Sequence, residues 1–140
     1  MNLEIKKLDS RAILPAYSYK DDAAFDLFSI NDVELESGQK AQISTGIAMK
    51  IPENHVGLIW DKSGLSQKHG LKNLGGVIDS GYRGEVMIGI INLSSETYTI
   101  ESGQKVAQMI IQKKETCEIV EVDDLDDSER GEKGFGSSGK

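Results

Sequence analysis

Short apolar runs separated by turn residues recur along the chain, and this pattern predicts an all-β fold. The runs that alternate or are rich in β-branched residues lie at 3–8, 23–29, 47–51, 56–60, 76–78, 86–91, 105–113 and 118–122. In the run at 23–29, Asp26 is expected on the face opposite to its neighbours. No long segment shows the 3.6-residue period of an amphipathic helix. Short strands at regular spacing favour a barrel or a sandwich.

The stretch from 75 to 92, GGVIDSGYRGEVMIGIIN, places one carboxylate between two apolar runs. The runs predict two buried strands joined at a tight bend, with Asp79 where the first strand meets the turn. A strand end holds a carboxylate in place beside an open loop, which suits a general base. An aspartate before Ser80 and Gly81 equally suits a plain turn, in which it bonds its own backbone. From these residues alone both interpretations stay open.

Residues 61–70, DKSGLSQKHG, interrupt the strand pattern and predict one or two helical turns. Ser63 is the expected N-cap and Gly70 the expected terminator. Free backbone N–H groups at the helix start, with Lys62 beside them, suit a phosphate. The alternative is an ordinary surface turn.

Glu-Ser-Gly-Gln-Lys occurs twice, at 36–40 and at 101–105. Each copy predicts a glycine turn that leads into a strand, and the pair indicates a reused hairpin.

The last eleven residues, RGEKGFGSSGK, contain four glycines together with Arg130, Phe135, Ser137 and Ser138. A Gly-rich end of this kind is commonly a disordered tail. A cation, an aromatic ring and two hydroxyls on a closely approaching backbone also suit closure over a base and a polyphosphate.

Composition narrows the class of protein. The 140 residues predict one β domain over 1–122, followed by an acidic spacer and glycine-rich arm over 123–140. The net charge is −7, and residues 115–129 hold eight acids and no base, so the rest of the chain carries +1. This balance argues against broad nucleic-acid or anionic-membrane binding. A single cysteine, Cys117, excludes an internal disulfide, and two histidines are too few for a zinc-type site. With no signal peptide or membrane-spanning run, we expect a soluble, cytoplasmic protein.

Five motifs occur in order along the chain, and together they resemble the trimeric deoxyuridine triphosphatases (dUTPases). The motifs are AAFDLFS, KSGLSQKHG, GVIDSGYRGE, GQKVAQ and RGEKGFGSSG. Each is weak alone, but five in order are specific. The resemblance implies an all-β, dUTPase-like β-barrel or jelly-roll-type domain with one short helix and a flexible C-terminal arm. It also implies hydrolysis of dUTP to dUMP and pyrophosphate, which limits uracil incorporation into DNA and supplies dUMP for dTMP synthesis.

The same resemblance implies roles for individual residues. Asp79 would orient and deprotonate the attacking water, and the Tyr82 ring would leave no room for a 2′-hydroxyl. Asn73 and the backbone of Val77 and Ile78 would read uracil. The other substrate-binding positions are Met87 at a further substrate contact, Lys62, Ser63, Gly64 and Gln108 on the phosphates, and Arg130, Phe135, Gly136, Ser137 and Ser138 from the arm.

The resemblance further implies Mg²⁺ as a cofactor held by the triphosphate and water. Asp26 matches an acid near the metal and phosphates, and no direct protein ligand is expected. A homotrimer with sites at subunit interfaces is implied, in which the acidic spacer lets each arm close a site on another subunit.

Some positions depart from the family pattern. Asp61 and Lys62 stand where the second motif usually begins Pro-Arg, Ala24 replaces a usual Gly, and Gly81 stands where an acid is frequent. Lysine keeps the positive charge but loses the fork that grips phosphate at two points. Asp61 brings a negative charge near the expected triphosphate, which either weakens binding or requires Lys62 to pair with it.

Three other interpretations compete. dCTP deaminase, including its bifunctional form, shares the fold but is expected to be longer and to differ after the central aspartate. A non-catalytic dUTP-binding regulatory protein would bind nucleotide without releasing pyrophosphate. A structural β-barrel without ligand leaves the composition of the tail unexplained.

Overall fold

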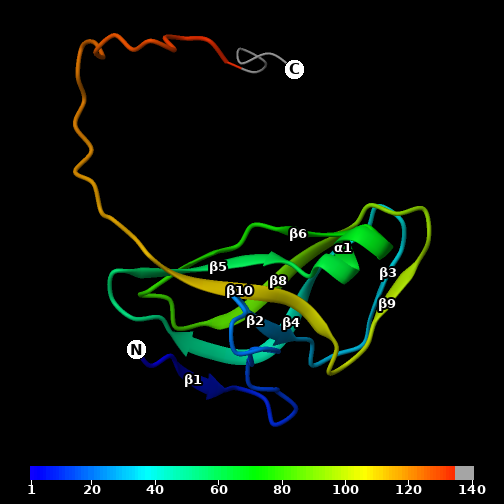
Figure 1. Ribbon diagram of the computed structural model, residues 1–140. Helices are drawn as coiled ribbons and strands as arrows, with labels where there is room; N and C mark the ends of the chain where they lie inside the picture. Colours follow the sequence, from blue (N-terminus) through cyan, green and yellow to red (C-terminus); the bar gives the residue numbers. More distant parts are fainter. Residues whose placement is uncertain (135–140) are drawn as a thin grey trace.

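The chain forms antiparallel sheets with one short helix over residues 1–134, which this computed structural model describes (Figure 1). One four-stranded sheet has the order β1 (Glu4–Lys7), β4 (Lys40–Lys50), β8 (Glu85–Asn92), β6 (Leu71–Leu74). The other has the order β2 (Phe25–Phe28), β10 (Lys105–Lys113), β5 (His55–Asp61), β7 (Val77–Asp79). A small third sheet pairs β3 (Val33–Leu35) with β9 (Tyr98–Ile100), and α1 spans Ser63–His69. The all-β prediction is therefore confirmed.

The core is built by the inward-facing residues of these sheets. In β8 every second residue is buried, and Val86, Ile88 and Ile90 are at most 1% exposed. Such alternation is expected of an antiparallel sheet that covers a core on one face. The buried cluster draws on both four-stranded sheets, with Phe25, Leu27, Ile43, Ile47, Met49, Val106 and Met109 among its members.

The two Glu-Ser-Gly-Gln-Lys copies fold into the same turn. In the first, the Gln39 side-chain oxygen accepts from the Glu36 N–H at 2.9 Å, and in the second, Gln104 accepts from Glu101 at 3.0 Å. Gly38 and Gly103 have φ of 76° and 83°, where glycine costs least. The expected hairpin is wrong, because the strands before and after each turn belong to different sheets. Each copy is a corner between sheets.

Two expected strands near residues 40 and 50 are one. β4 runs through 11 residues, with a register shift between Ser44 and Ala48 opposite β8. Gly46 lies within this irregularity at φ 65°, and a side chain there would press on Ala12 and Asp9 at 3.1 Å. A bulge thus keeps the strand continuous where the apolar pattern is interrupted.

The stretch around residue 79 also differs from expectation. β7 and β8 follow each other in sequence but lie in different sheets, so they form no hairpin. β7 is an edge strand, and Val77 is 67% exposed, so the prediction of two buried strands is wrong for β7. The apolar residues of β7 predicted burial. Within one chain, however, β7 lies at the edge of its sheet and no other strand of the described residues adjoins its outer side.

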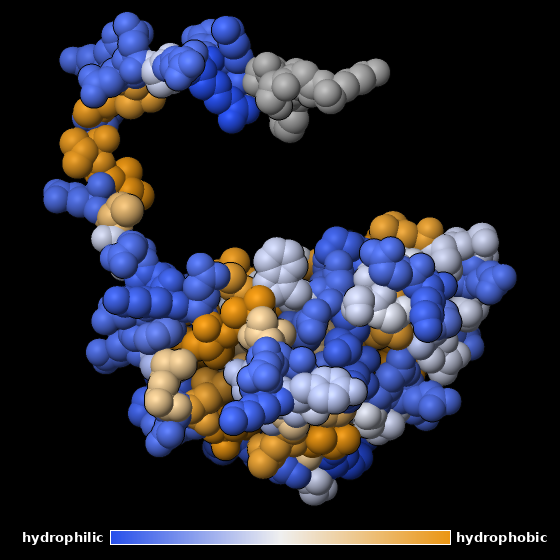
Figure 2. All heavy atoms as spheres, in the orientation of Figure 1, coloured by the Kyte–Doolittle hydropathy of each residue, from blue (hydrophilic) through white to orange (hydrophobic). Residues whose placement is uncertain are grey.

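No helix or strand is present from residue 114 to 134, and this segment leads away from the sheets (Figure 1). The strand predicted at 118–122 is therefore wrong within the single chain. An isolated strand leaves its backbone groups unpaired, and no neighbouring strand of the described chain pairs with it. Figure 2 shows apolar side chains along this segment, where Ile119 and Leu125 are 97% and 82% exposed. From here on the arm is the segment from residue 114 onward, of which the structure describes residues 114–134. Among the described residues, no helix has the length and apolar character needed to cross a membrane.

Candidate active site

A buried carboxylate, Asp26, forms the centre of a charged network on β2. Its two oxygens pair with Lys62 at 2.6 Å and with Lys105 at 2.7 Å, and Ser18 donates to it at 2.9 Å. Burial raises the pKa of Asp26, but Lys105, Lys62 and Ser18 together outweigh burial and hold that pKa below its ordinary value. Asp26 is only 3% exposed, although its neighbours Phe25 and Leu27 are buried too. Asp26 lies on the face opposite to Phe25 and Leu27, as expected, and it is buried because that face of β2 is covered as well.

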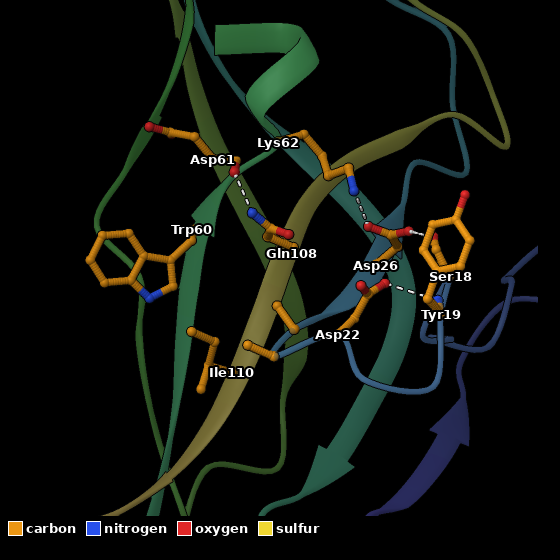
Figure 3. Close-up of a pocket in the computed structure, with 11 residues that line it drawn as sticks. Ser18, Tyr19, Asp22, Asp26, Trp60, Asp61, Lys62, Gln108 and Ile110 are labelled. Carbon is orange, nitrogen blue, oxygen red and sulfur yellow. Dashed lines mark hydrogen bonds and ion pairs between the residues drawn. The ribbon is translucent and has the colours of Figure 1, made fainter. Parts of the chain in front are cut away.

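The Asp26 network borders a cavity of about 520 Å³. Gln108 on β10 pairs in register with Asp26 on one side and Trp60 on the other, so these side chains follow the same face of the sheet. The cavity is lined by Ser18, Tyr19, Asp22, Ala23, Ala24, Asp26, Trp60, Asp61, Lys62, Gln108 and Ile110 (Figure 3). Three predicted site residues, Asp26, Lys62 and Gln108, therefore meet here.

The helix expected after β5 is present. Gly70 ends it in the left-handed conformation at φ 67°, as predicted. The N-cap, however, is Lys62 and not Ser63, and no side chain caps the helix. Ser63 and Gly64 form the first turn of this helix. They directly follow Lys62, which lines the cavity.

Asp61 and Lys62 point in opposite directions (Figure 3). Lys62 reaches Asp26, whereas the Asp61 carboxylate pairs with Lys72 at 2.7 Å and accepts from the Asn73 N–H at 2.7 Å. Of the two consequences expected for Asp61, weaker binding or pairing with Lys62, the pairing is not observed. The negative charge of Asp61 is balanced by another cation.

Asn73 lies on β6, beside the turn that carries the chain from one sheet to the other. Gly75 and Gly76 have φ of 79° and 136°, and a side chain on Gly76 would lie 2.8 Å from the Ile59 carbonyl oxygen. Only glycine allows this close approach. The side-chain nitrogen of Asn73 is buried and has no hydrogen-bond partner within residues 1–134.

Asp79 ends β7 and is exposed. Its backbone oxygen accepts from the Tyr82 N–H at 3.1 Å, and no group of the described chain donates to its carboxylate. The plain turn interpretation needed that carboxylate to bond its own backbone, so the structure does not support it. The carboxylate is left to face solvent.

Tyr82 stands in the turn between β7 and β8 and is 45% exposed. Its hydroxyl donates to the Glu85 carbonyl at 3.0 Å, which fixes the ring. Gly84 gives the ring room, because a side chain there would lie 2.6 Å from the Tyr82 ring carbon Cζ. Met87 lies further along β8, partly buried, on the face away from Val86.

Of the residues predicted at the C-terminal end of the chain, Arg130 belongs neither to the cavity beside Lys62 nor to the turn that carries Tyr82. Arg130 is exposed and donates to the Lys133 carbonyl at 3.0 Å. Phe135, Gly136, Ser137 and Ser138 lie outside the described residues, so their predicted contacts are not addressed by the structure.

A family model described as dUTPase matches residues 10–139. A deoxyuridine 5′-triphosphate nucleotidohydrolase from Nautilia profundicola is 45% identical, over 100% of both chains. The chain belongs to the dUTPase family.

Solved dUTPase structures agree with this assignment. A mutant of the Staphylococcus bacteriophage 80alpha dUTPase with dUpNHpp has a TM-score of 0.93 and 36% identity, covering 99% of each chain. A mutant dUTPase from phage phi11 of S. aureus, described with a structural Mg(II) ion, has a TM-score of 0.84 and 33% identity. It covers 89% of this chain and 99% of its own. The fold is thus the jelly-roll-like β fold of the dUTPases.

Two residues of the Asp26 network, Ser18 and Lys105, were not predicted from the sequence. Lys105 belongs to the fourth motif, but nothing local connects it to Asp26, which lies 79 positions earlier. Ser18 lies in a loop whose neighbour Ala16 bridges to Asp26. Their proximity depends on strand pairing, which short motifs do not record.

Magnesium held by protein groups alone would need a different set of groups from those that the described residues offer. Mg²⁺ is usually held by one or two carboxylates together with substrate phosphates and water. Both oxygens of Asp26 are occupied by lysines, and residues 1–134 contain no cluster of three or more His, Cys, Asp or Glu side chains. Residues 1–134 therefore offer no all-protein magnesium cage within one chain.

Proposed function

We propose that this dUTPase family member hydrolyses dUTP to dUMP and pyrophosphate, as a dUTP diphosphatase. The observation that carries the proposal is the exposed carboxylate of Asp79, which ends a strand and accepts no hydrogen bond within the described chain. A general base must be able to reach the proton that it removes. The relatives named for this activity supply the substrate class.

In the proposed reaction, Asp79 orients a water and takes its proton. The water oxygen bonds to the α-phosphorus, and the bond from that phosphorus to the oxygen bridging to the β-phosphate breaks. The electron pair leaves with pyrophosphate, and dUMP keeps the α-phosphate. In-line transfer of this kind depends on alignment and on neutralising charge.

Other residues of the chain bind and orient the substrate. Lys62 supplies a cation, and Ser63, Gly64 and Gln108 supply hydrogen-bonding groups beside it, toward the phosphate chain. Because the cavity next to Lys62 contains Gln108 as well, these contacts are available together. Mg²⁺ carried by the triphosphate would add charge neutralisation when bound, and no protein ligand to it is proposed.

A second set of residues, near the turn between β6 and β7 and in and after the turn that follows β7, is assigned to the base and sugar. Asn73 on β6 has a buried unpaired donor, and Val77 and Ile78 begin β7 directly after the glycine turn that follows β6, so this region suits the uracil edge. The fixed ring of Tyr82 suits the face of the deoxyribose, where it blocks a 2′-hydroxyl, and Met87 is a further contact. Discrimination then follows from polar groups that a wrong base leaves unpaired.

We further propose that the enzyme is a homotrimer whose arm completes a site on another subunit. The exposed apolar side chains of the arm, Ile119, Val120, Val122 and Leu125, support docking on a neighbouring chain. The arm would bring Arg130 to the terminal phosphate, with Phe135 over the base and Gly136, Ser137 and Ser138 beside the phosphates. In a cell this activity would limit uracil in DNA and supply dUMP.

The test is pyrophosphate release measured side by side with dUTP, dCTP, dTTP and UTP. We expect turnover of dUTP and, for the others, a kcat/KM lower by about 100-fold or more, as polar discrimination allows. Ammonia release from dCTP would indicate a deaminase instead. Binding of dUTP without pyrophosphate release would indicate a regulatory protein.

The Asp79→Asn variant separates catalysis from binding. We expect it to bind dUpNHpp as the wild type does and to lose about 100- to 10,000-fold in kcat, the range for removing a general base. A variant that hydrolyses dUTP at the normal rate would refute the role of Asp79.

A further inference from the structure

Asp61 joins the edges of two sheets. β6 pairs with β8 in the first four-stranded sheet, whereas Asp61 ends β5 in the second. One carboxylate oxygen accepts from the Asn73 N–H at 2.7 Å, and the other pairs with Lys72 at 2.7 Å. Two adjacent residues of β6 are thus held by one side chain of β5.

The backbone of Asp61 makes a third link. Its carbonyl oxygen accepts from the Gln108 side-chain nitrogen at 2.9 Å. Asp61 therefore contacts a residue proposed for the phosphates through its backbone and a residue proposed for the base through its side chain.

Asn73 is the part of this arrangement that points to a ligand. Its backbone N–H is satisfied by Asp61, but its buried side-chain nitrogen has no partner among residues 1–134. A buried donor is costly unless a bound group supplies the acceptor. The O4 oxygen of uracil is such an acceptor, whereas cytosine carries an amino group, another donor, at the same position.

We propose that Asp61 is a positioning residue for nucleobase recognition. By holding the Asn73 N–H it fixes β6 in place, and this aims the Asn73 side-chain nitrogen at a uracil carbonyl. Lys72 orients the Asp61 carboxylate and balances its charge. The proposal rests on the proposed function and deepens it, because it concerns the choice of base and not the chemical step.

The experiment compares Asp61→Ala with Asp61→Asn, measuring kcat and KM for dUTP and dCTP. Asp61→Ala removes the acceptor, so we expect KM for dUTP to rise about tenfold, kcat to change less than about threefold, and the preference for dUTP over dCTP to fall. Asp61→Asn keeps a side-chain oxygen that accepts the same N–H. The Asp61→Asn variant should therefore keep a KM for dUTP and a preference for dUTP over dCTP close to those of the wild type.

Glu4→Ala is the control, because Glu4 also makes an ion pair between two strands, with Lys50 at 2.9 Å, and neither residue lines the cavity beside Lys62. It should leave KM and base preference unchanged. A role limited to folding would lower Tm in Asp61→Ala without moving KM or base preference, and that result would overturn the proposal. Should Asp61→Ala not fold, Asp61→Glu displaces the carboxylate by one methylene. Unchanged KM and preference in that folded variant would equally overturn it.

Failure of this inference is distinguishable from failure of the proposed function. A wild-type protein that releases no pyrophosphate from any nucleotide refutes the function itself. A wild type that hydrolyses dUTP, with Asp61→Ala equal to it in KM and base preference, refutes only the role of Asp61.

Discussion

Asp79 and Lys62 lie beside opposite ends of strand β5. Asp79 pairs with Val56 near the start of β5, and Lys62 directly follows Asp61, its last residue. The extended chain from Val56 to Lys62 spans roughly 20 Å. A base has to lie within hydrogen-bonding reach of its water, so one chain does not bring Asp79 to phosphates held by its own Lys62. We therefore propose that a site using both residues combines two chains.

Mixing two inactive variants tests this shared site. We expect Asp79→Asn and Lys62→Met each to lose most dUTP turnover when alone. In randomly assorted trimers co-expressed from both, about a quarter of the sites would have both residues intact, so about a quarter of wild-type turnover should return. The measurement is dUTP turnover by the purified co-expressed protein, compared with turnover by each variant expressed alone. A mixture no more active than its components would place both residues in the same chain's site.

Removal of the end of the chain tests the arm. Truncation after Glu129 deletes Arg130 and everything beyond it, but leaves the exposed apolar residues of the arm in place. We expect dUTP turnover to be lost while the oligomer keeps its mass in light scattering. A truncated protein that dissociates would contradict the idea that these last residues act only on the substrate.

The charge on Asp26 predicts a pH dependence of stability. Removing one member of a buried ion pair is costly, so Asp26→Asn should lower the free energy of unfolding by about 2 kcal/mol at pH 7. The folded-state pKa of Asp26 lies below the ordinary value of 3.8, so its contribution is complete above that value and is lost as pH falls through the folded-state pKa. Urea unfolding at pH 7 and in acid measures both stabilities. A difference between wild type and variant that stays constant into strong acid would contradict the ionised role of Asp26.

Gly84 offers a way to move Tyr82 without replacing it. A methyl group at residue 84 would collide with the ring, so Gly84→Ala should displace the ring and reduce the preference for dUTP over UTP by about tenfold or more. The kcat/KM values for the two nucleotides measure it. Gly81→Ala is the matched control, since a side chain there meets nothing within 4 Å. Equal preference in the wild type and in Gly84→Ala would show that the ring does not read the sugar.

Local features were predictable from the sequence because they depend on neighbouring residues. The glycine turns at Gly38 and Gly103, the end of α1 at Gly70, and most strands follow from turn chemistry and alternation. Three motif residues named from the sequence, Asp26, Lys62 and Gln108, line one cavity, and the roles of the motif residues remain predictions. Errors arose where a strand's neighbours decided the outcome, as in the exposure of Val77 and the absence of a strand at 118–122.

The sequence by itself determined which segments extend, which turn and which short motifs bear polar groups. Only the tertiary structure decided that Lys105 and Ser18 join Lys62 on Asp26, that Asp61 pairs with Lys72, and that β5 holds Asp79 and Lys62 apart. The physical reason is that turns and alternation act over a few residues, whereas ion pairs and strand order depend on contacts between segments distant in the chain.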